Sequence, residues 1–198
     1  LTGSWITVTW AAQGIVLIWI GFLLWRNWHV RAFGLSVLAL ATARLLIFDT
    51  IVDIEDFRFV LNDRFPTFLA TIAIFYGGAY IYWKQRHYLS QWESNIHMIL
   101  AAIANFLTLW IFSAEIIAFF DSRELAAGKL SLLDAAQSAE NSKILSITAI
   151  WAIYALALLA VALAKRSQTL RWAGLGLLLL PVAKLVVLDT FLVDLNPA

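Results

Sequence analysis

Long apolar stretches fill most of the chain, and short polar segments separate them. A helix needs about 20 apolar residues to cross a bilayer, and six stretches approach that length. They lie at about 5–25, 32–50, 66–83, 96–120, 143–164 and 172–192. The pattern predicts an all-α polytopic membrane helix bundle with about six transmembrane helices, which together form a single transmembrane domain over residues 1–198.

One part of this pattern occurs twice: the segment 166–190 aligns with the segment 26–50 without a gap. Charged residues are costly in lipid, so their recurrence indicates one structural unit used twice. We expect two parallel helical-hairpin repeats, at about 5–50 and 145–190 (within 143–192), related by a pseudo-two-fold along the membrane normal. A central hairpin at 66–120 separates them in sequence. The matched pairs include Arg26 and Arg166, Arg31 and Arg171, Gly34 and Gly174, Asp49 and Asp189, and Thr50 and Thr190, while Arg44 falls on Lys184.

Composition and charge narrow the class of protein. Hydrophobic residues make up 62% of the chain and the mean hydropathy is +0.82, which is typical of an integral membrane protein. The formal net charge of +1 gives no electrostatic basis for binding nucleic acid. The chain contains no cysteine, which excludes disulfides and thiolate metal sites.

The polar connections predict an orientation in the membrane. The segments after the first, third and fifth predicted helices are short and basic. The positive-inside rule therefore places them in the cytoplasm and both termini outside it. On the opposite side, residues 121–142 mix charged residues with leucine and predict a surface helix that is interrupted near Gly128.

Several polar residues share one depth toward the outer side. Arg44, Glu115 and Lys184 come late in three helices that run outward, and Gln13 lies at a comparable level in the first helix. We expect these four residues to line an outward-facing polar pocket for a membrane lipid or another amphiphile. The structural alternative is that the basic side chains reach the interface or form ion pairs only. The expected pairs across the repeat are Arg44 with Asp189 and Lys184 with Asp49.

Other candidate chemistry is sparse. His29, His87 and His97 fall at predicted helix ends, and no two of them share a helix at ligand spacing, so we expect no metal site and no cofactor. No catalytic residue is assigned. In the alternative in which the protein is an enzyme, Glu115 would act as the acid or base, and Arg44 or Lys184 would hold an anionic head group.

The run LRWAGLGLLLLPVAKLVVLDT at 170–190 follows the apolar helix ITAIWAIYALALLAVALAKR and resembles the repeat unit of a bacterial family of predicted polytopic membrane proteins of unknown function. Members are longer and have more spans, so the resemblance implies a fragment of a longer member and an architecture without a stated activity. It also implies a location in the bacterial inner membrane. The pattern is carried by Trp151, Arg171, Gly174, Leu175, Lys184, Leu185 and Asp189. The first copy matches through Arg31, Gly34, Leu35, Leu45 and Asp49, with Arg44 in place of lysine.

Three functions remain open at this point. The sequence favours a non-enzymatic membrane module, transporter-like or a scaffold, that holds a lipid or amphiphile. The first alternative is a membrane enzyme that acts on a lipid-linked substrate. The second alternative is an accessory subunit of a larger membrane complex, whose partners are the helices of other membrane proteins.

Overall fold

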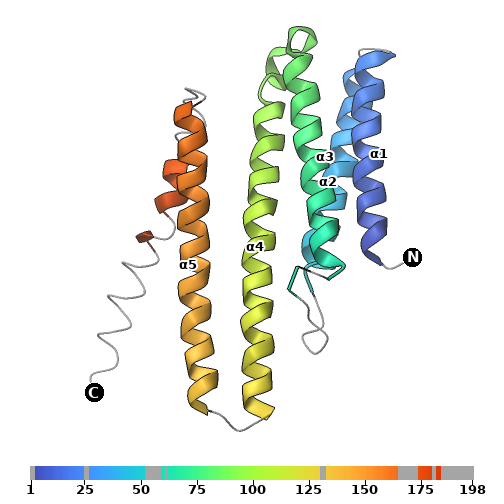
Figure 1. Ribbon diagram of the computed structural model, residues 1–198. Coiled ribbons are helices and arrows are strands. Elements are labelled where there is room, and N and C mark those ends of the chain that lie inside the picture. Colours follow the sequence, from blue (N-terminus) through green and yellow to red (C-terminus); the bar gives the residue numbers. More distant parts are fainter. Residues whose placement is uncertain are drawn as a thin grey trace. The chain divides into compact units, whose positions relative to one another are not determined.

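The computed structural model describes residues 3–24, 27–51, 59–60, 62–129, 133–164, 174–179 and 182–183. Regular structure in these ranges is helical throughout, and five helices are long and apolar enough to cross a membrane (Figure 1). The expected all-α polytopic bundle is confirmed. The helices are α1 (Gly3–Leu23), α2 (Trp28–Ile47), α3 (Arg64–Lys84), α4 (Ile96–Lys129) and α5 (Leu133–Ala164), with two short 3-10 helices, η1 (Arg86–Tyr88) and η2 (Gln91–Glu93), between α3 and α4.

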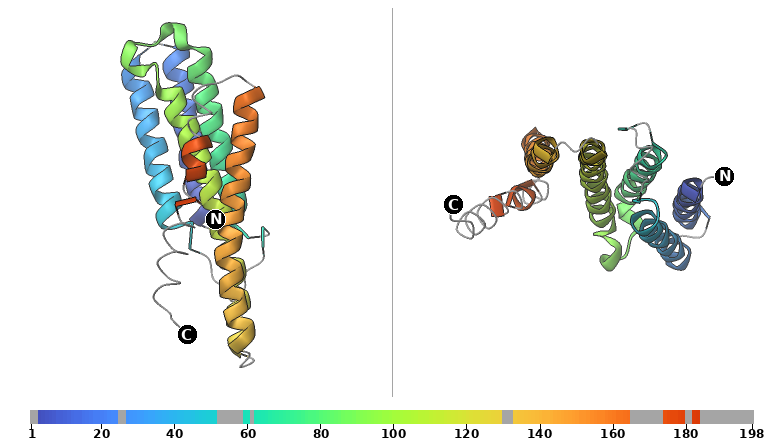
Figure 2. Two further views of the ribbon diagram at one scale, coloured as in Figure 1. Left: turned by 90° about the vertical axis from the view of Figure 1, so that its left-hand side faces the viewer. Right: turned by 90° about the horizontal axis from the view of Figure 1, so that it is seen from below.

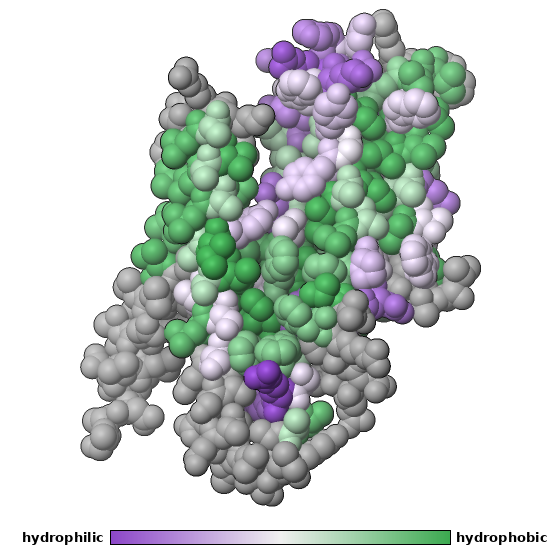
Figure 3. Space-filling view, viewed as in Figure 1, coloured by the Kyte–Doolittle hydropathy of each residue, from purple (hydrophilic) through white to green (hydrophobic). Residues whose placement is uncertain are grey.

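Hydrogen bonding explains how polar residues are accommodated in these helices. A helix satisfies its own backbone groups, which is what a chain in lipid requires. The hydroxyls of Thr42, Thr71 and Ser113 each donate to a carbonyl one turn earlier, at 2.8 to 2.9 Å. On the face that Figure 3 shows, apolar side chains dominate along the helices, and hydrophilic ones gather at the end that carries η1 and η2.

The chain divides into two compact units, Leu1–Phe119 and Phe120–Ala198. In the first unit, α1, α2, α3 and the first part of α4 run side by side (Figure 2). Large apolar side chains fill the space between these helices, and the most deeply buried include Ile18, Leu38, Leu45, Phe68, Phe75 and Leu107. The expectation of a single domain stays a prediction.

Two details of the predicted boundaries are wrong. The second helix starts at Trp28 and not near residue 32, because Arg31 lies inside α2 and is buried there. Asn27 caps this helix, since its side-chain oxygen accepts a hydrogen bond from the backbone N–H of His29 at 2.9 Å. The separate surface helix expected at 121–142 is also wrong, because its described residues belong to the long helices α4 and α5, although α4 does end at Lys129, next to the interruption expected near Gly128. Most of the sixth predicted span, 172–192, lies outside the described residues.

Glycines allow two pairs of helices to approach closely. A Cβ atom at Gly34 would lie 2.7 Å from the carbonyl oxygen of Gly14 and 3.0 Å from the backbone nitrogen of Ile18. In the second unit, a Cβ atom at Gly174 would lie 2.8 Å from Leu159 Cγ and 3.3 Å from its backbone nitrogen. Only a residue without a side chain fits at these positions. The two-fold repeat itself stays a prediction.

Candidate functional site

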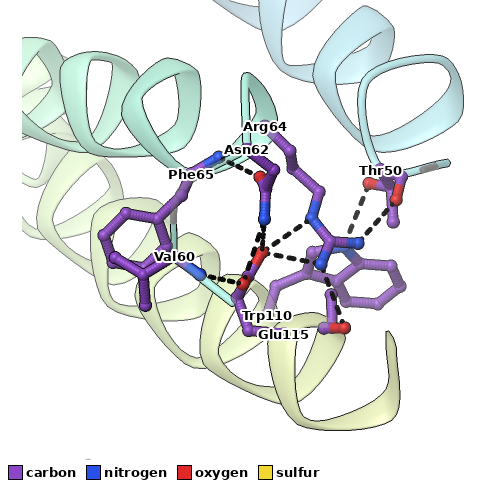
Figure 4. A network of polar contacts seen from close by, with 8 residues as sticks. Thr50, Val60, Asn62, Arg64, Phe65, Trp110 and Glu115 are labelled. Carbon is purple, nitrogen blue, oxygen red and sulfur yellow. Dashed lines mark hydrogen bonds and ion pairs between the residues drawn. The ribbon is translucent and has the colours of Figure 1, made fainter. Parts of the chain in front are cut away.

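Glu115 lies on α4, and its side chain is only 1% exposed. Its Oε1 atom accepts hydrogen bonds from Arg64 Nη2 at 2.7 Å and from Arg64 Nε at 3.1 Å. The side-chain amide of Asn62 donates to both carboxylate oxygens at 2.9 and 3.1 Å, and the backbone N–H of Val60 donates to Oε2 at 2.9 Å (Figure 4). The carboxylate is therefore bound on both oxygens and its charge is balanced by a guanidinium.

Arg64 extends this arrangement to two more segments. Its Nη1 atom donates to the backbone carbonyl of Thr50 at 2.9 Å, and Nη2 donates to the carbonyl of Ala114 at 3.1 Å. Trp110 Nε1 donates to the Thr50 hydroxyl at 3.2 Å. The residues Thr50, Val60, Asn62, Arg64, Trp110 and Glu115, here named the Glu115 cluster, thus join the end of α2, the start of α3 and α4 (Figure 4).

The geometry of the Glu115 cluster favours a structural role. A general acid or base must reach a proton on the substrate within hydrogen-bond distance, and both oxygens of Glu115 already accept from the protein. Val60 has a positive φ of 64°, a costly conformation for a β-branched residue, and this conformation accompanies the hydrogen bond from its N–H to Glu115. In the ranges that the structure describes, no three His, Asp or Glu side chains gather as a metal site would require.

Arg44 makes polar contacts within the α1–α2 hairpin. Its Nε atom donates to the Thr7 hydroxyl at 3.0 Å, and that hydroxyl in turn donates to the carboxylate of Asp49. The guanidinium also lies 5.9 Å from the ring centroid of Trp10. Thr7 therefore connects Arg44 on α2 with Asp49 in the turn that follows this helix.

The structure separates some of the residues that the sequence placed in one pocket. Gln13 lines a hollow of about 250 Å³ on α1 together with Trp5, Thr9 and Trp10, and neither Arg44 nor Glu115 belongs to its lining. Arg44 nevertheless lies beside Trp10, one wall of this hollow. Lys184 and Asp189 lie outside the described residues, so the complete pocket and the pairs Arg44–Asp189 and Lys184–Asp49 stay predictions.

A second buried ion pair lies at the η1–η2 end of the first unit. Arg31 Nη2 donates to both oxygens of Glu93 at 2.8 and 2.9 Å, and Arg31 Nε donates to Oε1 at 3.0 Å. Both side chains are 3% exposed. Ser90 also donates its hydroxyl to Glu93 at 2.8 Å, and the Arg31 guanidinium lies 4.7 Å from the centroid of the Phe22 ring. This pair joins α1, α2 and η2.

An apolar groove of about 530 Å³ runs between α2 and α4. It spans positions from Leu35 to Leu46 on α2 and from Ile96 to Phe106 on α4, which is about 15–17 Å along each helix, or roughly half of the hydrocarbon thickness of a bilayer. Its lining includes one hydroxyl, that of Thr42, and this donates to the carbonyl of Leu38 at 2.8 Å. The groove therefore offers a hydrocarbon surface with small residues, Ala39 and Ala43, along it.

Comparison with models of known protein families assigns the chain to one family. The family model described as "Predicted membrane protein (DUF2339)" matches residues 51–193, well over half of the sequence. The chain belongs to this family. It is thus a membrane protein of unknown function with several apolar helices, and the resemblance to a family of predicted membrane proteins is confirmed, while the repeat and the fragment stay predictions. No curated protein and no solved structure matches the chain.

Sequence reasoning found Glu115 but missed its partner. Arg31 and Arg64 fall between the predicted spans 5–25, 32–50 and 66–83, which predicts solvated loop residues. In the structure each is a buried cation: Arg64 binds a glutamate 51 residues later, and Arg31 binds one 62 residues later. The sequence does contain a signal for each pair. A lone carboxylate on or beside α4 requires a cation, and in each case an arginine lies at the end of another helix at the same depth in the membrane.

Proposed function

We propose that the chain is a non-enzymatic integral membrane module, transporter-like or a scaffold, whose first unit holds the hydrocarbon chain of a lipid or amphiphile between α2 and α4. The groove carries this proposal. Its volume of about 530 Å³ lies in the range of small-molecule sites, which is about 300–1,000 Å³, and its lining is almost entirely apolar. An acyl chain is the ligand that such a surface fits best in a bilayer.

The polar clusters support the non-enzymatic part of the proposal. The Glu115 carboxylate is held by Arg64, Asn62 and Val60, so its oxygens are occupied by contacts that fix helices. The alternative membrane enzyme with Glu115 as acid or base, and the outward-facing polar pocket that includes Glu115, both require some of these contacts to be given up. They therefore have less support than the apolar groove.

Photo-cross-linking tests the groove directly. The purified protein is placed in vesicles that contain a phosphatidylethanolamine with a diazirine on its acyl chain, and labelled peptides are mapped by mass spectrometry. Labels should fall on α2 and α4 beside the groove. Ala39→Trp, which fills the groove, should lower this labelling several-fold, whereas Leu40→Trp, at a 61% exposed position outside the lining, should not. Equal labelling in both variants would refute the proposal.

The proposed location is the bacterial inner membrane, with the η1–η2 end in the cytoplasm and both termini outside. The native chain has no cysteine, so single cysteines report access without background. In intact cells, cysteines at positions 88 and 168 should resist an impermeant thiol reagent, and cysteines at 57 and 131 should react. The reverse labelling pattern would invert the orientation and leave the groove proposal intact.

A further inference from the structure

Three buried side-chain atoms in the described part of the chain have no hydrogen-bond partner there, and all three belong to the η1–η2 end of the first unit. They are Arg31 Nη1 in the first turn of α2, Tyr82 Oη in the last turn of α3 and His97 Nδ1 in the first turn of α4. In the same described part, the Glu115 cluster contains no such atom. A buried polar group without a partner is costly, so these atoms indicate where a group from outside the chain binds.

Arg31 and Tyr82 belong to one compact arrangement around the ring of Phe22. The Arg31 guanidinium lies 4.7 Å from the centroid of this ring, and the Tyr82 ring contacts it edge to face at 5.1 Å between centroids. The Tyr82 hydroxyl interacts electrostatically with both Arg31 and Glu93. It nevertheless has no hydrogen bond within the described residues, so the phenol and the guanidinium are neighbours whose polar atoms do not bond directly.

Burial and charge balance define what can bind between these groups. Tyr82 is 0% exposed, Glu93 2% and Arg31 3%, so only a very small molecule fits there. The charge of Arg31 is already balanced, because its guanidinium donates to both oxygens of Glu93. An anion would add a buried charge without compensation, whereas a neutral ligand adds none. Water is the small neutral ligand that accepts from one buried donor and bonds to a hydroxyl at the same time.

We propose that one water molecule is bound between Arg31 Nη1 and Tyr82 Oη as part of the folded protein. The water oxygen accepts from Nη1, and the water and the Tyr82 hydroxyl share a second hydrogen bond. Buried waters make about two to four hydrogen bonds to polar groups that would otherwise be unsatisfied. This water extends the Arg31–Glu93 pair, which joins α1, α2 and η2, to α3. The proposal does not depend on the lipid groove.

Radiolytic labelling of the purified protein tests this directly. An X-ray pulse converts bound water into hydroxyl radicals, which oxidise the adjacent side chain even where bulk solvent has no access. Tyr88, which is 54% exposed in η1, is the positive control. Phe75, which is 1% exposed in the apolar core and lies on the same helix as Tyr82, is the negative control. Tyr82 should be oxidised at least about ten times faster than Phe75, because apolar surroundings hold no ordered water.

Tyr82→Phe makes the test specific, because it removes the hydroxyl and keeps the ring. Labelling at position 82 should fall to the level of Phe75, and the thermal unfolding midpoint should drop, because the water and Arg31 lose a partner. A dry hydroxyl predicts the opposite, since removing an unsatisfied buried group is neutral or stabilising.

Two results would overturn the proposal: Tyr82 labelling as slow as that of Phe75, or a midpoint of Tyr82→Phe that is unchanged or raised. Replacing chloride by gluconate in the buffer should change neither the labelling nor the midpoint. A chloride dependence of the labelling would also overturn the proposal, because an anion would then occupy the site.

Discussion

The two buried arginine–glutamate pairs of the first unit differ in how many other groups support them. Arg64 donates to Glu115 and also to the carbonyls of Thr50 and Ala114. Arg31 donates to Glu93 only, among the hydrogen bonds within the described residues, and its Nη1 atom has no partner there. One cation therefore sits in a network, and the other depends on a single carboxylate.

From this difference we expect that burial alone does not determine how much an ion pair contributes to the stability of the protein. Both pairs are almost fully buried, with side-chain exposures of 1–4%. Removing one partner of a buried pair is costly mainly because the remaining charge loses its compensation. The cost should therefore depend on what the remaining arginine can still bind, which is more for Arg64 than for Arg31.

The largest expected effect is that of Glu93→Gln. Arg31 would keep its charge in a buried site without a carboxylate, and we expect a loss of about 3–5 kcal/mol in the free energy of unfolding. Thermal unfolding of the purified protein in one detergent measures this. Ser90→Ala, which removes one hydrogen bond to the same carboxylate, should cost only about 1 kcal/mol.

Glu115→Gln should cost less, about 1–3 kcal/mol, because the two backbone carbonyls continue to bind Arg64 and the new amide oxygen accepts from Asn62. The same unfolding assay ranks the two variants. If Glu115→Gln proves more destabilising than Glu93→Gln, the supporting carbonyls do not compensate and the comparison fails. If Glu115→Gln leaves stability unchanged and removes bound lipid, the outward-facing polar pocket gains support.

The sequence predicted the helices far better than the polar contacts, and the reason is physical. Hydrophobic length is a local property, so five spans follow from the chain itself. The start of α2 was misplaced because a charge near a predicted helix end indicates a loop unless its partner is known, and Glu93 lies 62 residues after Arg31. Glu115 stood out as a lone carboxylate in an apolar helix. Its binding by Arg64, Asn62 and Val60 depends on a loop conformation that no local pattern specifies.

Gly34→Ala, measured by the same thermal unfolding assay, tests how tightly α1 and α2 pack against each other beside the Arg31–Glu93 pair. The new Cβ atom would lie 2.7 Å from the Gly14 carbonyl oxygen, and overpacking of this kind costs about 1–3 kcal/mol. Gly77→Ala is the matched control, because its Cβ atom would have 3.4 Å to the nearest atom and alanine is the better helix former. It should be neutral or stabilising. Equal losses in both variants would show that the close approach is not tight.

The smallest expected effect is that of Lys143→Ala in the second unit. Lys143 Nζ lies 2.7 Å from Asp121 Oδ1, but the two side chains are 23% and 29% exposed. Partly exposed pairs of this kind contribute about 0–1 kcal/mol. The unfolding midpoint should shift little, and it should shift less still at high salt. A loss as large as that of Glu93→Gln would mean that exposure is a poor guide to these pairs.

The spacing of the two buried pairs has a consequence for synthesis of the chain. Arg31 is made 62 residues before Glu93, and Arg64 is made 51 residues before Glu115, so both cations enter the translocation machinery ahead of their carboxylates. The early helices must therefore wait, with their charges solvated or held by the insertase, until η2 and α4 emerge. Delivery of η2 and α4, which follow each other directly, supplies both carboxylates. A ribosome stalled just before η2 should hold α1 to α3 in a state that is inserted, loosely associated and easily extracted.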